Sequence, residues 1–116
     1  MQWGAGLKNY LLLVNLERIP ERRSAQLEVY RALDRQFLGS APVTSNQVNV
    51  IDLDQFELTS TDMPVLVCRD MIAIPLLFTC SADGQHLSLE HTHPPASLAI
   101  HGERWNIQKQ LKRYWF

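Results

Sequence analysis

His91 and His93 are the two side chains whose type and spacing are best suited to chemistry. They lie two residues apart, so on a strand both imidazoles point to the same face. A His-x-His pair is a common way to present two nitrogen ligands to a metal ion. Glu90 and His86 fall on the opposite face of such a strand. The simpler interpretation is a solvated strand end, and a metal or small-ligand site at the two histidines is the alternative.

Acids and cysteines offer weaker patterns. Asp52 and Asp54 come near the end of a predicted strand, where α/β proteins often bind ligands, although one surface acid and one capping acid is the more frequent outcome. Cys68 and Cys80 do not make a disulfide framework and fit small apolar positions in or near a core, with a regulatory thiol as the alternative. The sequence has neither a glycine-rich phosphate loop nor a nucleophile elbow. It predicts no enzyme and no cofactor.

Residues 103–116 are basic and end in three aromatics. Side chains that partly fit one helical face are Trp105, Ile107, Gln108, Leu111 and Trp115. Cations around that face are Arg104, Lys109, Lys112 and Arg113. One interpretation is that Ile107, Leu111 and Tyr114 dock on the sheet while the cations stay in water. The other is that Trp115 and Phe116 anchor a protein partner or a second subunit, because Trp, Tyr and Arg are enriched at interface hot spots.

Composition limits the class of protein. A chain of 116 residues suits a single domain, 1–116, and 46% apolar with 20% charged residues indicates a folded chain. A net charge of −1 gives no reason to expect nucleic acid. No apolar run reaches the roughly 18 to 20 residues that span a bilayer, so no membrane partner is expected. The opening residues lack a secretory pattern, which favours a reducing, cytoplasmic location.

The first half of the chain predicts strand, helix and strand. Asn9–Leu16 is a nearly continuous apolar run, typical of a strand buried on both faces. Pro20 and Gly39 suit the two ends of a helix over Glu21–Leu38. Apolar residues at helical spacing on that segment are Leu27, Tyr30, Leu33 and Phe37. Val48–Leu53 predicts a second strand, and the helix would make it a parallel neighbour of the first through a right-handed crossover.

The second half predicts a hairpin and a helix. Asp54–Asp70 fits a short helix or another strand. Pro75 donates no N–H, so a strand begins there or lies at an edge, and Leu76–Cys80 continues it. The Asp83-Gly84 turn then joins it to His86–Thr92. A last helix covers some part of Ala96–Tyr114. These elements predict an α/β fold, a mixed sheet with helices on both faces.

This order resembles the thioredoxin-like fold. Ile74-Pro75-Leu76-Leu77-Phe78 stands where that family starts its third strand with a cis-proline, and Val50-Ile51-Asp52 is similar to its second strand. The resemblance implies a three-layer sandwich with a mixed four-stranded sheet. Residues 16–23 stand where redox members carry Cys-x-x-Cys and contain no cysteine, so it implies no thiol–disulfide exchange.

Among redox-inactive relatives, the chain is similar to the KaiB family of clock proteins and to the KaiB-like sensor domain of their partner histidine kinase. These also have an apolar first strand, a Val-Ile-Asp second strand and a proline-entered third strand. Where that family has Thr-Pro-Thr-Leu, this chain has Ile74-Pro75-Leu76-Leu77. The resemblance implies a regulatory role of circadian type.

Together these features predict a redox-inactive, regulatory protein–protein interaction module in the cytoplasm, which binds a protein partner or associates with itself. The predicted partner-binding residues come from the Glu17–Arg23 loop, the proline-entered strand and the C-terminus: Arg18, Arg22, Ile74, Pro75, Arg113, Trp115 and Phe116. The alternatives are a metal- or small-ligand-binding protein that uses His91 and His93, or an accessory subunit of a larger complex.

Overall fold

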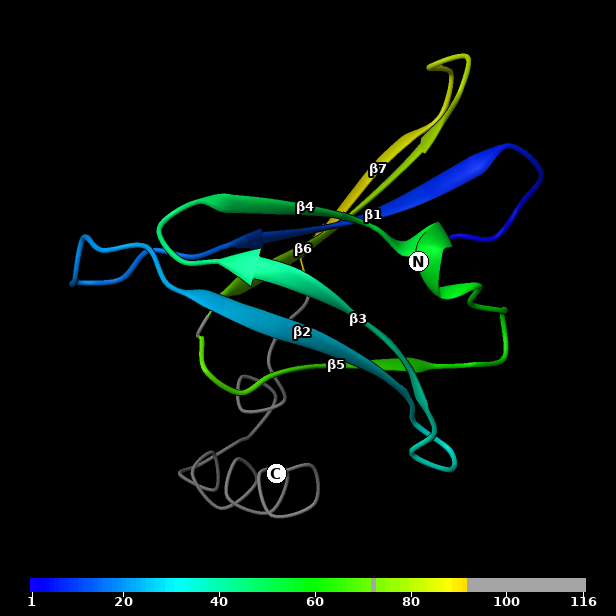
Figure 1. Ribbon diagram of the computed structural model, residues 1–116. Coiled ribbons are helices and arrows are strands. Elements are labelled where there is room, and N and C mark those ends of the chain that lie inside the picture. Colours follow the sequence, from blue (N-terminus) through cyan, green and yellow to red (C-terminus); the bar gives the residue numbers. More distant parts are fainter. Residues whose placement is uncertain (72, 92–116) are drawn as a thin grey trace, which may run out of the picture.

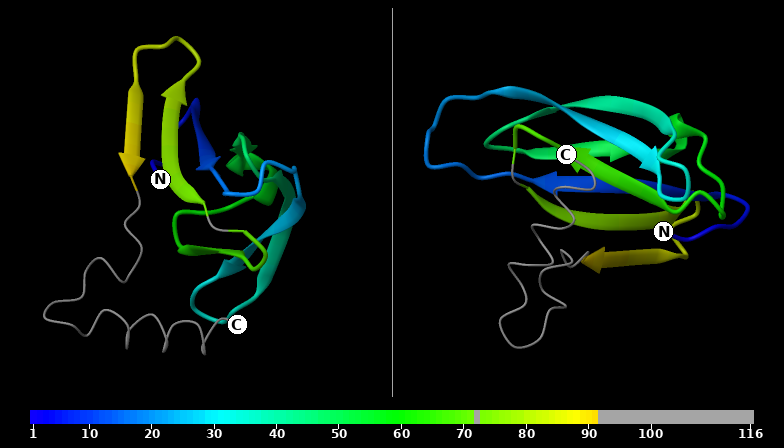
Figure 2. Two further views of the ribbon diagram at one scale, coloured as in Figure 1. Left: turned by 90° about the vertical axis from the view of Figure 1, so that its left-hand side faces the viewer. Right: turned by 90° about the horizontal axis from the view of Figure 1, so that it is seen from below.

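The computed structural model describes residues 1–71 and 73–91, which form two antiparallel sheets (Figure 1). Sheet A has the strand order β4-β1-β6-β7 and sheet B has β3-β2-β5. The strands are β1 (Leu7–Val14), β2 (Ser24–Arg31), β3 (Phe37–Thr44), β4 (Val48–Asp52), β5 (Pro64–Cys68), β6 (Ile74–Ser81) and β7 (Leu87–His91). Figure 2 shows that the β6–β7 hairpin extends beyond sheet B.

The predicted α/β sandwich with helices on both faces is wrong. The only helical element among the described residues is a 3-10 turn, η1 (Leu53–Phe56), and none there is long and apolar enough to cross a membrane. The predicted final helix lies outside the described residues, and so does Thr92, the last residue of the predicted hairpin.

The predicted helix over Glu21–Leu38 is replaced by the β2–β3 hairpin. Leu27 and Val29 are buried on one face of β2, and Tyr30 points to the other face. The helical spacing therefore grouped residues that a strand separates. Leu33, which the helix would have buried, is 91% exposed in the turn. Buried and more exposed side chains alternate with a period of two residues, as in a strand, rather than recurring at the spacing of a helix.

Gly39 has a different role from the predicted helix end. It lies in β3 opposite Val29, beside the irregularity in register between Val29 and Tyr30. Its φ is +154°, and an added Cβ would come within 2.8 Å of Phe56 Cδ1. The glycine lets the ring of Phe56 pack on the strand, so this position serves close packing.

β1 and β4 are antiparallel neighbours, contrary to the predicted parallel pair, with Leu12 opposite Val50. The segment between them forms a hairpin in the other sheet, which brings the chain back from the opposite direction. β1 also pairs antiparallel with β6, where Leu12 lies opposite Leu76. β1 is therefore an interior strand, as its apolar run predicted, in a sheet of different topology.

The predicted hairpin is confirmed in β6 and β7. Gly84 has a φ of +70°, and Asp83 Oδ1 accepts a hydrogen bond from the backbone N–H of Gln85 at 3.0 Å. The Ile74–Pro75 bond, whose isomer the sequence leaves open, is trans, since the described residues contain no cis peptide. It differs in this from the cis-proline of the thioredoxin-like family.

Both alternatives for Asp54–Asp70 are partly correct. The segment begins in η1, where Asp52 Oδ1 accepts from the N–H of Asp54 at 3.0 Å, and it ends in β5. Asp52 is thus the capping acid that the sequence favoured over a cation ligand.

The core lies between the two sheets. It consists of alternate residues of both sheets with two side chains from η1 and one from the β5–β6 connection: Leu11, Leu13, Leu27, Val29, Ala41, Val43, Ile51, Leu53, Phe56, Met71 and Leu77. In β1, odd-numbered residues face this core and even-numbered residues face the opposite side of sheet A.

Asparagine side chains join two connections at one end of the sandwich, the loop from β1 to β2 and the turn from β3 to β4. The fully buried Asn15 accepts from the Asn46 N–H at 2.6 Å, and Asn46 Oδ1 accepts from the Glu17 N–H at 2.8 Å. Asn46 Nδ2 donates to the Ile19 carbonyl at 2.8 Å. These bonds satisfy backbone groups where β1 leaves sheet A and β4 enters it. We call this cluster the asparagine corner.

We predict that Asn46→Ala lowers the free energy of unfolding by about 1–3 kcal/mol, because backbone groups lose their partners. Alanine also tolerates the observed φ of +56° poorly. Urea denaturation measures the change, with the exposed Gln26→Ala as control. Equal midpoints for the two variants would contradict the role of the corner.

Candidate functional site

The outer face of sheet A, turned away from sheet B, is largely apolar. Apolar side chains from all four strands share this face: Tyr10, Leu12, Val14, Val48, Val50, Ile74, Leu76, Phe78, Leu87 and Leu89. We call this set the outer patch. It follows from the register, because the even-numbered residues of β1 lie opposite even-numbered residues of β4 and β6.

Cross-strand pairs make the outer patch continuous. Leu12 lies between Val50 and Leu76, and the Tyr10 and Phe78 rings have centroids 6.4 Å apart. Phe78 in turn lies opposite Leu89 of β7. Neighbouring side chains on one face of a sheet contact each other in this way, so the patch extends over the four strands from β4 to β7. Figure 1 shows these strands as one sheet.

Much of the outer patch is open in the described structure. Val50 is 64% exposed, Leu87 66% and Leu89 62%. Leu16 follows β1 directly and is 85% exposed. Single exposed apolar residues are common, but a contiguous patch across four strands is typical of an interaction site.

The outer face of sheet B is more mixed, because polar residues of β2 have apolar neighbours there, and Glu28 lies opposite Val67 of β5, which is 3% exposed. Gln26 lies opposite Pro42, and Glu28 lies opposite Ser40. Glu28 accepts a hydrogen bond from Tyr30 Oη at 2.8 Å and forms an ion pair with Arg69 at 3.2 Å. The outer face of sheet B therefore mixes charged, polar and apolar side chains, whereas the outer face of sheet A is largely apolar.

Charged side chains border the outer patch at one end. Lys8 Nζ lies 3.5 Å from an Asp54 carboxylate oxygen and 3.9 Å from one of Asp52. The Asp52 carboxylate is the main reason that the pKa of Lys8 is raised above 10.5. Two carboxylates therefore share one ammonium group, and this end of the patch has an excess negative charge.

Of the predicted binding residues, Arg18, Arg22, Ile74 and Pro75 lie among the described residues. Ile74 is 54% exposed and lies opposite Val14, at the end of sheet A from which the loop of residues 15–23 departs. Arg18 and Arg22 are exposed on that loop. Pro75 belongs to the opposite, inner face of β6.

The predicted binding residues Arg113, Trp115 and Phe116 lie outside the described residues. Sequence reasoning also missed the centre of the outer patch, including Leu12, Val50 and Leu89. The signal was present, because the apolar run in β1 indicates that both of its faces are to be covered.

The histidines do not form a metal site within the described residues. His91 is exposed on the outer face opposite Leu76, and His93 lies outside the described residues. Residues 1–71 and 73–91 contain no group of three His, Cys, Asp or Glu arranged to hold a metal ion. Glu90 points to the inner face, as the strand parity predicted, and accepts from the N-terminal amine at 3.4 Å.

The two cysteines are free and lie on different sheets. Cys68 is packed against the core, and burial raises the pKa of its thiol. Cys80 is half-buried on the outer face, opposite Lys8 and Leu87. Cys68 therefore fits the predicted core position, and Cys80 lies beside the outer patch.

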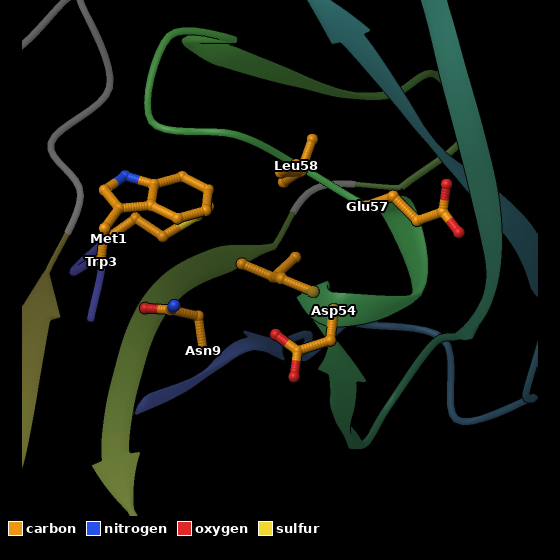
Figure 3. Close-up of a pocket in the computed structure, with 7 residues that line it drawn as sticks. Met1, Trp3, Asn9, Asp54, Glu57 and Leu58 are labelled. Atoms are coloured by element: carbon orange, nitrogen blue, oxygen red, sulfur yellow. The ribbon is translucent and has the colours of Figure 1, made fainter. Parts of the chain in front are cut away.

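A small hollow of about 160 Å³ lies between the N-terminal residues and η1 (Figure 3). The Asn9 amide at its side is already used, since Nδ2 donates to the Gln2 carbonyl at 2.9 Å and Oδ1 accepts from Thr79 Oγ1 at 2.8 Å. The Glu57 carboxylate points away from Trp3. Ligand pockets usually measure about 300–1,000 Å³ and have convergent polar groups, so this hollow is a poor ligand site.

A wider depression of about 610 Å³ lies beside the β2–β3 turn, and its polar groups bind one another. Arg31 Nε donates to Asp62 Oδ1 at 2.7 Å, and Asp62 Oδ2 accepts from the Thr59 N–H at 2.6 Å and from its hydroxyl at 2.7 Å. These hydrogen bonds, those from Thr59 first, lower the pKa of Asp62 from 3.8 to about 2. This network ties the η1–β5 connection to β2.

Comparison with known proteins gives no assignment. No family model matches the chain, and no similar protein is found among curated proteins or solved structures. The resemblance to the KaiB family therefore stays a prediction, and the thioredoxin-like architecture is wrong because the described fold is built of antiparallel strands.

We predict that the Asp62 network makes the protein sensitive to acid. The pKa of Asp62 is lower in the folded protein, about 2 against 3.8, so its stabilisation is present above pH 3.8 and is lost as the pH falls towards 2. Urea denaturation between pH 2 and 6 should show a shallower pH dependence for Asp62→Asn than for the wild type. Identical slopes would contradict this assignment.

Proposed function

We propose that the protein is a non-catalytic interaction module whose outer patch binds an amphipathic helix of a protein. The observation that supports this most is a continuous apolar face over four strands, on the side of sheet A away from the core. The proposal keeps the predicted protein–protein role and gives it a different surface. Ile74 is the predicted residue that lies on it.

The size of the outer patch suits one helix. Four strands about 4.8 Å apart and five residues long define a face of roughly 19 by 17 Å. A twelve-residue helix is about 18 Å long and 10 Å wide. Laid on the patch, it would cover the middle of all four strands and remove Leu12 and Leu76 from water.

The same dimensions make a second copy of the chain a poorer occupant. The face measures roughly 300 Å² in projection, whereas a stable protein interface buries about 800 Å² on each partner. A symmetric pair would need contacts beyond the patch. An amphipathic helix needs only an apolar stripe, and such helices are commonly recognised by apolar surfaces.

The test uses a synthetic helical peptide with leucines at i, i+3, i+4 and i+7 and lysines elsewhere. It is titrated into the full chain carrying Leu111→Asp. This substitution interrupts the apolar residues of segment 103–116, so that this segment competes less with the peptide for the outer patch. We predict methyl NMR shifts for Leu12, Val50 and Leu76, with a Kd between micromolar and millimolar.

Val50→Asp should weaken that binding at least about tenfold, because docking would bury an unpaired carboxylate. Gln26→Asp on the outer face of sheet B is the matched control and should leave the Kd unchanged. The proposal fails if the peptide causes no shifts at millimolar concentration, or if shifts appear only at inner-face residues such as Leu11.

A further inference from the structure

We infer that the outer patch is occupied by residues 103–116 of the same chain. The inference rests on the proposed function, since it names the helix that the patch binds. It begins from β1, whose apolar run indicates two covered faces. The described residues cover only the inner one, where Leu11 and Leu13 are buried, while Leu12 and Val14 on the outer side remain half-buried.

The chain leaves sheet A at a suitable place. β7 is an edge strand of this sheet and ends at His91 on the outer face. Residues 92–102 then separate it from the amphipathic segment, and eleven residues span at most about 36–40 Å. This exceeds the roughly 19 Å width of the patch. The segment can therefore return over any of the four strands.

The sequence of the segment complements the patch. Ile107, Leu111 and Tyr114 recur at i, i+4 and i+7, which predicts one apolar stripe on a helix. Residues 103–116 contain four basic side chains and one acidic one. The excess negative charge beside Lys8, from Asp52 and Asp54, lies at one end of the patch and favours such a cationic segment.

Covalent attachment favours this occupant over a free one. A short linker holds the segment at an effective concentration in the millimolar range, so even a weak contact is largely formed. An external partner helix must displace it and binds with correspondingly lower apparent affinity.

Cys80 provides a native attachment point for the test. Cys80 lies on the outer face of sheet A, whereas Cys68 packs against the core. For the experiment Cys68 is replaced by alanine, so that Cys80 is the one native cysteine left. In the full chain, a cysteine is introduced by Gln108→Cys or by Lys109→Cys, and a short bismaleimide is added. The two positions have nearly the same linker length but point about 100° apart around a helix. Position 108 lies nearer the apolar stripe.

We expect cross-linking between positions 80 and 108 to be at least about tenfold faster than between 80 and 109, and the product to migrate as a monomer. Adding Leu111→Asp should reduce the faster rate several-fold. Equal rates at the two positions, or products that form only between chains, would overturn the inference. Thermal melts of each variant confirm that sheet A remains folded.

Peptide affinity separates this inference from the proposed function. If the segment occupies the patch, the synthetic peptide binds the wild type roughly tenfold more weakly than it binds Leu111→Asp. Equal affinities for the two proteins would overturn the inference and leave the patch as a binding site. Absence of binding to both would overturn the proposed function itself.

Discussion

The pairing of β1 with both β4 and β6 is the constraint on which the rest of the structure depends. Its register places Leu11 and Leu13 in the core and sets Leu12 between Val50 and Leu76 on the other side. A shift by one residue would exchange these faces. The asparagine corner supports this register, because it joins the loop after β1 to the turn before β4.

As a consequence, sheet A has two apolar faces, and sheet B covers only its inner face. Sheet B mixes charged and apolar side chains on its outside, where Glu28 is paired to Arg69 and lies opposite Val67. The outer patch of sheet A, in contrast, leaves side chains such as Val50 and Leu89 exposed in the described structure. An amphipathic helix removes this cost without changing the strands, and the chain carries a suitable segment after its edge strand.

Sequence alone predicted the strands with clear alternation or turn chemistry, and it failed where periodicities overlap. The β6–β7 hairpin was predictable because Asp83-Gly84 fixes its turn. Leu27, Tyr30 and Leu33 were misread because their spacing fits a helix, although β2 places Leu27 and Tyr30 on opposite faces. With that helix came the wrong parallel pairing of β1 and β4.

The outer patch could not be predicted as a surface, since it depends on the register of four strands distant in sequence. Only its signal, the apolar run of β1, was visible. The central claim is that this face is covered in the full chain. Attenuation of methyl NMR signals by a soluble paramagnetic chelate tests it directly. We predict that Leu12 and Leu76 are protected nearly as well as the buried Leu11 and Leu77. Attenuation equal to that of the exposed Leu16 and Leu33 would contradict the account.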